Sequence, residues 1–349
     1  MSFLTEIEQQ SKALNKILEY YINNEGKDIL SKAASMINKS NSRAVIFLGM
    51  GTSCITPQII RDLLINKSKV LPLIYNAGEF LHYAIDSVTD KDVVIAISQS
   101  GESIETRKCV EQLKEHKYLI TITNNENSTM AKLSRLNLPM LAGSEESISN
   151  KTYSNLMAIL LMLGYSIINE STEKLVNNLK RCAEEMEIFN MKRKGEIKKA
   201  AEFLKGVNAL HFIARGPTVV AAEQASLTWM EGMRTNTTAF AGGGFRHGPF
   251  EMVGVNHKAI FYAPEGEGGA LIEKTAREIS GLGSKVLVFS GRNMKSSNNM
   301  MVIQVKPEEE LTFSVATAVP QELLLAQMAE DKGLVLGKFL RIDKITKVE

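Results

Sequence analysis

The stretch DVVIAISQSGESIETRKCVEQLK, residues 92–114, runs from a short apolar segment through a polar loop into a helical pattern. The apolar run 92–97 has the length of a buried strand, and the helical pattern begins near Ile104. Similar apolar runs, most of them followed by helical patterns, occur at 44–49, 118–123, 209–216, 258–263 and 285–290. Strands that alternate with helices indicate an α/β fold: parallel sheets flanked by helices in a doubly wound, flavodoxin-like, three-layer arrangement.

The strands fall into two sets that correspond in spacing. Gly51 follows the first strand of the first set and lies 165 positions before Gly216, which follows the first strand of the second set. Ser98 ends a strand of the first set and lies 165 positions before Ala263, which ends the corresponding strand of the second. The shared offset favours a duplicated α/β unit, although any α/β protein repeats such spacings. We therefore expect five segments: N-terminal helices at 1–40, a first domain at 41–170, a connecting helix at 171–205, a second domain at 206–335 and a C-terminal tail at 336–349.

The composition limits the classes of function. Of the 349 residues, 44% are hydrophobic and 23% charged, as in a globular protein with a buried core. A net charge of +2 does not suggest a nucleic-acid partner. The three dispersed cysteines, Cys54, Cys109 and Cys182, predict neither a disulfide framework nor a metal site, and we expect no cofactor. The first residues do not resemble a signal peptide, and no apolar run is long enough for a membrane span, so we expect a cytoplasmic protein.

The polar loop at 98–103 predicts a phosphate-binding site. Ser98, Gln99, Ser100 and Ser103, together with a glycine, follow a strand and precede a helix. A helix N-terminus presents free backbone N–H groups and a partial positive charge, which favour a bound anion. The alternative is that Ser103 only caps the helix, but one serine would be enough for that.

Two other polar segments could complete the pocket. Thr52 and Ser53 follow Gly51 after the first strand, and Ser147 and Ser149 precede a long apolar helix. Each could be an ordinary turn or cap. At the carboxyl edge of one parallel sheet, however, their hydroxyls would converge on the loop at 98–103.

A candidate acid–base pair lies in the second half. Glu231 is expected in the last turn of a helix from about Pro217 to Gly232, where the helix dipole disfavours a carboxylate. The alternative is a surface pair with Arg234, and the residues alone leave both readings open. His247 follows sixteen residues later in AGGGFRHGPFE and taken alone could be an ordinary loop histidine.

These motifs resemble the SIS (sugar isomerase) family, in particular its tandem-domain members related to the isomerase half of glucosamine-6-phosphate synthase. The resemblance rests on Gly51-Thr52-Ser53, SQSGES at 98–103, SNK at 149–151, FRHGPFE at 245–251 and the tail RIDKITKVE. It implies that the sugar phosphate is bound by Thr52, Ser53, Ser98, Gln99, Ser100 and Ser103, with Gly51, Ser147 and Ser149 at the sugar. It also implies that Glu231 is the proton-transfer base, that His247 opens the sugar ring and that Lys344 reaches the sugar. Without this context, Lys344 would be read as a solvated tail lysine.

Several positions depart from the synthase pattern. Thr228 stands where the synthase has a lysine, and Gln224 and Gly244 stand where glutamates are expected. Residue 2 is Ser2, and no glutaminase domain is recognisable, so we expect a chain that cannot take ammonia from glutamine.

The remaining branch of stand-alone tandem proteins contains deglycases and deaminases, which act on 6-phosphorylated sugar–amine conjugates or amino sugars by isomerisation and C–N cleavage. The segment FRHGPFE resembles the deglycases most. The alternatives are a pure aldose–ketose phosphosugar isomerase and a non-catalytic sugar-phosphate sensor, although residues 1–40 contain no basic DNA-reading module. The family also implies a homodimer or a higher homo-oligomer, in which His247 could serve the partner's site.

Overall fold

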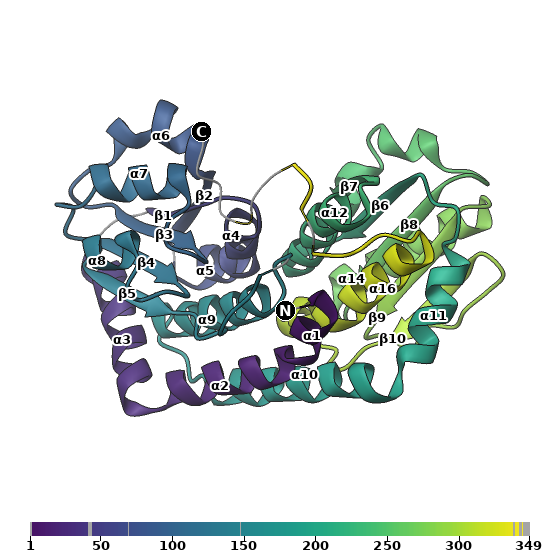
Figure 1. The fold of residues 1–349 in the computed structure, drawn as a ribbon, viewed down its shortest axis with the longest axis horizontal. Helices are drawn as coiled ribbons and strands as arrows, with labels where there is room; N and C mark the ends of the chain where they lie inside the picture. Colours follow the sequence, from purple (N-terminus) through teal and green to yellow (C-terminus); the bar gives the residue numbers. More distant parts are fainter. Residues whose placement is uncertain are drawn as a thin grey trace. The chain divides into compact units, whose positions relative to one another are not determined.

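Two five-stranded parallel sheets form the framework of the chain (Figure 1), which confirms the predicted α/β fold. The computed structural model describes residues 2–40, 44–68, 70–146, 148–337, 339–341 and 344. The first sheet has the order β2 (Leu71–Asn76), β1 (Ala44–Gly49), β3 (Val93–Ser98), β4 (Leu119–Thr123), β5 (Leu136–Pro139). The second has the order β10 (Met300–Gln304), β9 (Lys285–Ser290), β8 (Lys258–Ala263), β6 (Ala209–Ala214), β7 (Asn236–Ala241).

The two sheets share one topology, as the repeated spacing predicts. In each sheet the first strand of the set pairs with the second and third, and the fourth and fifth follow outward from the third. Strands β6, β7 and β8 each begin and end 165 positions after β1, β2 and β3. The offset of 165 positions, first seen between Gly51 and Gly216 and between Ser98 and Ala263, therefore holds for three whole strands.

The chain divides into two compact units, one around each sheet. The first-sheet unit comprises Lys12–Glu145, Lys151–Asn177 and Phe339–Glu349, and the second-sheet unit comprises Met1–Ser11, Glu146–Asn150 and Asn178–Lys338. Two helices contain residues of both units, α2 (Gln10–Ile22) and α10 (Glu173–Lys192).

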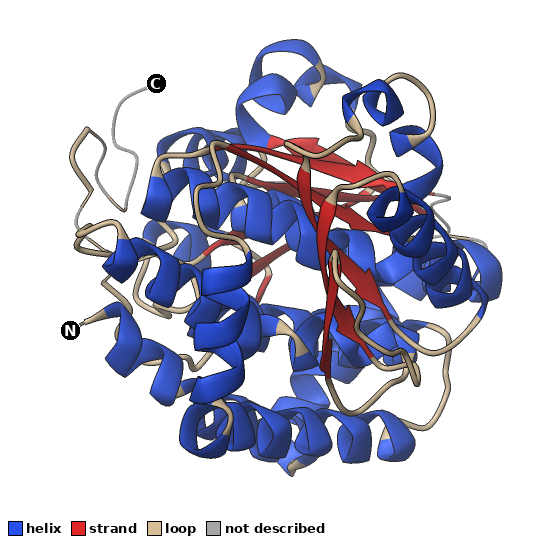
Figure 2. Cartoon of the chain, turned by 90° about the vertical axis from the view of Figure 1, so that its right-hand side faces the viewer, coloured by secondary structure: helices blue, strands red, loops and turns tan. Residues whose placement is uncertain are grey.

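The remaining helices surround the strands of their own unit (Figure 2). Those of the first-sheet unit are α3 (Asn24–Lys39), α4 (Thr52–Ile55), η1 (Thr56–Ile60), α5 (Arg61–Ser68), α6 (Ala77–Tyr83), η2 (Ile85–Ser87), α7 (Ile104–Gln112), α8 (Thr129–Leu133) and α9 (Lys151–Ile167). Those of the second-sheet unit are α1 (Phe3–Glu8), α11 (Lys194–Phe203), η3 (Gly216–Thr218), α12 (Val219–Met233), α13 (Gly242–Phe245), η4 (Pro249–Met252), α14 (Glu267–Gly281), α15 (Glu310–Ala316) and α16 (Ala318–Asp331).

The central strands are apolar because helices cover both of their faces. On one face of the first sheet, Ile46 and Val94 pack with Phe80 of α6 and Val110 of α7. The other face is covered by helices that include α3, which packs on β5. A strand buried on both sides cannot alternate polar and apolar residues, so it reads as a continuous apolar run.

Helix α9 matches the apolar segment that was expected to be a buried helix, and nearly all of its side chains are buried. Among the described residues, no helix combines the length and the apolar composition that a membrane span requires.

The corner between α2 and α3 is tight. Helix α2 ends at Ile22 and α3 begins at Asn24, which leaves one residue between them. Gly26 lies inside α3, where a Cβ atom would collide with the backbone carbonyl of Tyr20. The glycine therefore permits a close approach of two helices, and it does not end a helix.

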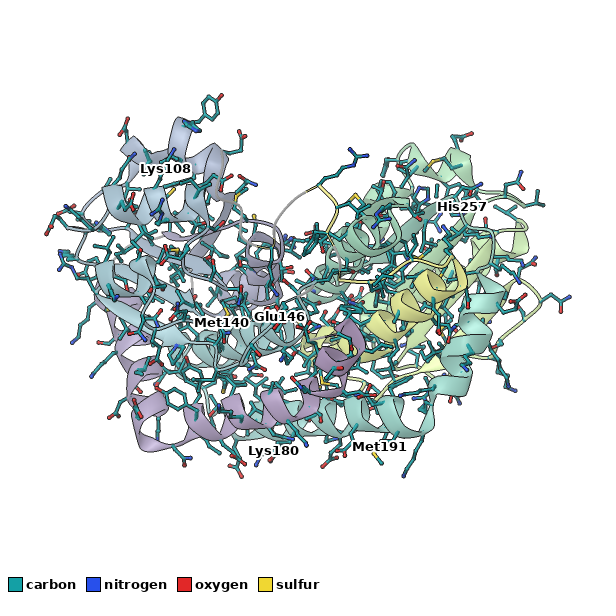
Figure 3. The ribbon with its side chains drawn as sticks, viewed as in Figure 1. Lys108, Met140, Glu146, Lys180, Met191 and His257 are labelled. Carbon is teal, nitrogen blue, oxygen red and sulfur yellow. The ribbon has the colours of Figure 1, made fainter. Side chains whose placement is uncertain are left out.

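A histidine pair joins strands at the amino end of the second sheet. His211 Nδ1 of β6 lies 2.9 Å from His257 Nε2, and His257 Nδ1 lies 3.0 Å from the hydroxyl of Ser284 (His257 is labelled in Figure 3). Burial, with a smaller effect of His211, lowers the pKa of His257 to about 4. Both rings are therefore neutral at pH 7, which allows one ring to donate to the other.

Helix α14 offers a test of helix-to-sheet packing. We expect Gly269→Ala to destabilise the protein by about 1–3 kcal/mol, because the new Cβ would collide with the backbone carbonyl of Pro264. Gly281→Ala in the same helix is the control, since no atom lies within 4 Å of its added Cβ. Thermal unfolding should show a lower Tm for the first variant and an equal or slightly higher Tm for the second. Equal Tm values would contradict the close packing at Gly269.

Candidate active site

Two polar segments of the first half lie at the carboxyl edge of the first sheet. Strand β1 pairs in parallel with β3, with Val45 opposite Val93 and Leu48 opposite Ala96. The segments that follow these strands, 51–53 and 98–103, are therefore neighbours. This is the edge at which open α/β sheets bind their ligands.

The loop after β3, called here the serine loop (residues 98–103), is held by its own hydroxyl groups. Ser98 Oγ accepts a hydrogen bond from the Gly101 N–H at 3.2 Å, and Ser100 Oγ accepts one from the Glu102 N–H at 3.1 Å. Ser103 occupies the N-cap position of α7 but makes no side-chain cap hydrogen bond. Its hydroxyl thus does not perform the capping role that was the alternative to phosphate binding.

Neighbouring elements fix the conformation of the serine loop. Gly101 has a φ of +68°, and a Cβ atom there would collide with Ser128. The Glu102 carboxylate accepts a hydrogen bond from the Thr129 N–H at 2.7 Å. The loop is therefore tied to the start of α8 from two sides, and a preformed loop loses little entropy when it binds an anion.

Asn124 is a second support of the serine loop, and the sequence reading missed it. Its backbone N–H donates to the Gln99 carbonyl at 3.0 Å, while its side chain accepts from the Ala142 N–H at 2.8 Å and donates to the Gly143 carbonyl at 2.7 Å. Asn124 directly follows β4. The rule that led to the serine loop, polar residues at the carboxyl end of a buried strand, would have identified it.

Gly51, Thr52 and Ser53 form the turn after β1. Gly51 has a φ of +51° and precedes α4, whose first two residues are Thr52 and Ser53. A Cβ at Gly49 would lie 2.7 Å from the backbone of Ser53, so the glycine at the end of β1 lets the turn fold directly over the strand. Thr52 and Ser53 are partly exposed, which leaves their side chains accessible to a ligand.

Lys344 lies against a buried carboxylate of the same unit. Its Nζ is 3.0 Å from Glu145 Oε2, and the Glu145 carboxylate also accepts from the Thr152 N–H at 3.0 Å and the Thr152 hydroxyl at 2.7 Å. Glu145 is only 6% exposed. Lys344 thus donates a hydrogen bond to the Glu145 carboxylate.

Of the two serines expected near the sugar, Ser147 lies outside the described residues. Ser149 lies partly buried in the segment Glu146–Asn150 of the second-sheet unit. The buried Glu6 carboxylate holds this segment by accepting from the Glu146 N–H at 2.6 Å and from the Asn150 side chain at 3.3 Å.

Glu231 lies in the last turn of α12, as expected, and is partly buried. The predicted helix end was wrong by one residue. The helix includes Gly232 and Met233 and is ended by Arg234, which has the left-handed φ of +51°. Gly232 is buried inside the helix, where a Cβ would lie 2.7 Å from Leu336 and 3.1 Å from Leu325. This glycine therefore serves packing and not termination.

His247 is exposed on the turn after α13, in the same unit as Glu231. Its backbone N–H donates to the Gly244 carbonyl at 3.0 Å. Gly248, with a φ of +110°, redirects the chain into Pro249 and η4. Of the three glycines before the histidine, Gly242 is packed against Arg215, whereas a Cβ at Gly244 would meet no atom within 4 Å. The absence of the expected glutamate at 244 therefore has no packing reason in this unit.

The second sheet has a glycine of positive φ at the matching place in its loop after β8, but it lacks the side chains of the serine loop. At the offset of 165, Ser98, Gln99, Ser100 and Ser103 correspond to Ala263, Pro264, Glu265 and Gly268, while Gly101 corresponds to Gly266, which also has a positive φ. The Glu310 carboxylate fills the space beside this second loop. A Cβ at Gly268 would lie 2.5 Å from Glu310 Oε1, and one at Gly216 would lie 3.2 Å from it.

Comparison with known proteins agrees with this architecture. Residues 38–167 match the family model of the SIS domain. The chain is 25% identical over 355 residues to a glutamine–fructose-6-phosphate aminotransferase (isomerizing) of Thermococcus kodakarensis, a match that covers 99% of this chain and 58% of that protein. The chain thus spans less than two thirds of the length of this curated relative.

Two solved structures share the fold over nearly their whole length. The C-terminal domain of glucosamine-fructose-6-phosphate aminotransferase from Francisella tularensis superposes with a TM-score of 0.80 at 21% identity, covering 96% of this chain and 97% of that one. Glucosamine-6-phosphate deaminase from Thermotoga maritima superposes with a TM-score of 0.73 at 21% identity, covering 99% of both chains.

The rigidity of the serine loop is testable at Gly101. We expect Gly101→Ala to lower the Tm, because it combines a strained φ with a collision against Ser128. Gly143→Ala is the matched control: its φ of +71° imposes the same backbone strain, but no atom lies within 4 Å of the added Cβ. Thermal unfolding of both variants measures the difference. If the Tm falls by the same amount in the two variants, the contact with Ser128 does not shape the loop.

Proposed function

Since a SIS domain spans residues 38–167 and the second sheet repeats its topology, we propose that this chain is a sugar-phosphate enzyme that isomerises a 6-phosphorylated amino sugar or sugar–amine conjugate and releases the amine. The observation that carries the proposal is the serine loop, whose conformation is fixed by Gly101 and Ser128 and whose Ser103 hydroxyl is not used as a helix cap.

In this proposal the phosphate binds at the serine loop. The first N–H groups of α7 have no acceptor within the helix, and the helix dipole adds a partial positive charge there. The hydroxyls of Thr52, Ser53 and Ser103 donate further hydrogen bonds to the phosphate oxygens. Gln99 can donate through its amide nitrogen.

The proton transfers are assigned to Glu231 and His247. His247 takes the proton of the anomeric hydroxyl and returns it to the ring oxygen, which opens the sugar. Glu231 then moves a proton between C1 and C2. In a 2-amino aldose this converts the C2 amine into a ketimine, and in a ketosamine it converts the C1 amine into an aldimine. Water hydrolyses either imine to a carbonyl group and the free amine.

Lys344 has a supporting role in this proposal. Held by Glu145, its ammonium can donate a hydrogen bond to a sugar hydroxyl or to the carbonyl oxygen that forms on ring opening. A covalent imine with the sugar would require Lys344 first to leave Glu145 and lose a proton.

One observation favours C–N cleavage over amine transfer. Thr228 and Gln224 replace the charged residues expected in the synthase, so the surroundings of Glu231 differ from those of an enzyme that builds the C–N bond. The deciding experiment is to incubate the protein with glucosamine 6-phosphate and a panel of 6-phosphorylated ketosamines and to measure free amine. Ketose–aldose interconversion without amine release would identify a pure phosphosugar isomerase.

The phosphate site can be tested by binding alone. We expect the double variant Ser100→Ala with Ser103→Ala to weaken fructose 6-phosphate binding at least about tenfold, because the phosphate loses the Ser103 hydroxyl and the serine loop loses the Ser100 hydroxyl that accepts from the Glu102 N–H. Ser290→Ala, at the end of β9 in the other unit, is the control and should bind normally. Calorimetric titration with fructose 6-phosphate and with fructose measures the effect. Equal affinity of the unaltered protein for both sugars would disprove phosphate recognition.

The catalytic base can be tested by separating turnover from binding. We expect Glu231→Gln to lower kcat at least about 100-fold while the affinity for the sugar phosphate stays within about threefold, because the amide keeps the size of the side chain but cannot take a proton. Glu223→Gln, two turns earlier in α12, is the matched control and should retain turnover. Turnover near the unaltered level in Glu231→Gln would assign the base to another residue.

A further inference from the structure

A cavity of about 610 Å³ in the second-sheet unit is lined by four cationic side chains and one carboxylate. The cations are Arg215, Arg246, Lys274 and Arg277, and the carboxylate is Glu278. This arginine cavity therefore has an excess of three positive charges. Its volume lies in the range of pockets that bind small molecules.

Arg215 extends along the glycines that precede His247. It follows β6, and a Cβ at Gly242 would lie 3.0 Å from its Nε, while one at Gly243 would lie 3.7 Å from its Nη2. Any side chain at 242 would therefore displace the guanidinium. Two of the three glycines thus provide the surface on which Arg215 rests.

The Arg215 guanidinium retains unused donors. Its Nε is buried and has no hydrogen-bond acceptor among the residues that the structure describes. An arginine stays protonated at any physiological pH, and a buried donor without an acceptor is costly. Arg215 also lines the arginine cavity, where its guanidinium can donate to acceptor oxygens of a ligand.

The other charges are partly neutralised. Arg246 pairs with Glu278, which lowers the pKa of that carboxyl, and Arg277 pairs with Glu273 at 2.8 Å. Lys274 is exposed on α14, one helical turn before Glu278. An anion in the cavity would therefore meet Arg215 and Lys274 directly and would compete with Glu278 for Arg246.

The loop after β8, which corresponds to the serine loop, is occupied by a carboxylate of the protein itself. The counterpart of the serine loop lacks its hydroxyls, and the carboxylate of Glu310 lies beside Gly216 and Gly268 at the start of α14. A phosphate at that position would be repelled by Glu310. Glu310 is not among the residues that line the arginine cavity.

We propose that the arginine cavity is a second anion site, which binds a phosphate-bearing small molecule through Arg215, Arg246 and Lys274. The site goes beyond the proposed reaction and does not depend on it, because all of its residues lie in the second-sheet unit and none belongs to the serine loop. Its occupant would lie next to Arg246, the residue before His247.

The experiment removes the first site and measures the second with inorganic phosphate. In protein carrying Ser100→Ala and Ser103→Ala, calorimetric titration should still show saturable binding of one phosphate per chain. Adding Arg215→Gln should weaken this binding at least about tenfold, because a charged bidentate donor is lost. Arg181→Gln is the matched control: Arg181 is an exposed arginine of the same unit, 3.5 Å from Glu308, and its loss should leave binding unchanged.

Two surface variants keep the test decisive if Arg215→Gln unfolds. Lys274→Gln should weaken phosphate binding about threefold, and Glu278→Gln should strengthen it about threefold by releasing Arg246. The absence of phosphate binding in the Ser100/Ser103 double variant, or unchanged affinity in Arg215→Gln and Glu278→Gln, would overturn the proposal. Neither result affects the serine loop, which is tested separately with intact Arg215.

Discussion

The parallel pairing of β1 with β3 is the constraint on which the candidate site depends. It brings the ends of both strands to one edge of the sheet, so that the turn at Gly51 and the serine loop become neighbours although they are almost fifty residues apart in sequence. The pairing requires crossover helices on the faces of the sheet, and these helices bury the strands on both sides. The first helix N-terminus after β3, that of α7, then faces the same edge with its unpaired N–H groups. The sheet, its core and the place of the candidate site thus follow from one hydrogen-bonding pattern.

The two halves show how one topology supports different chemistry. Both carry a glycine with positive φ at the same place in the loop after the third strand, Gly101 and Gly266, but the helix that follows begins two positions earlier in the second unit, at Glu267. The serines of the first loop are replaced in the second by alanine, glutamate and glycine, and Glu310 places a carboxylate where a phosphate would otherwise be attracted. The second unit instead gathers arginines around the glycines before His247. An anion site depends on side-chain donors and net charge as much as on a helix N-terminus.

Much of the fold could be predicted because its signals are local. The buried strands β1, β3, β4, β6, β8 and β9 read as apolar runs, and the prediction of parallel sheets followed from their alternation with helices. Strands β2, β5 and β10 were missed. They lie at sheet edges and have partly exposed residues, so they lack the burial on both faces that makes the central strands read as long apolar runs. The end of α12 was misplaced because a glycine that serves packing against Leu336 looks, in sequence, like a glycine that ends a helix.

The amino-acid sequence by itself determined the α/β class, the duplicated framework and the serine loop. Their signals are the apolar runs of the strands and the polar residues that follow them, and both can be recognised from residues that are close in sequence. The tertiary structure alone decided which polar groups are engaged in hydrogen bonds within the protein and which can still bind a ligand. It showed that Ser103 makes no cap, that Glu145 holds Lys344, that Asn124 braces the loop, and that Arg215 keeps a buried donor without an acceptor among the described residues. Each of these facts depends on contacts between segments distant in sequence, and such contacts leave no periodic signal in the chain.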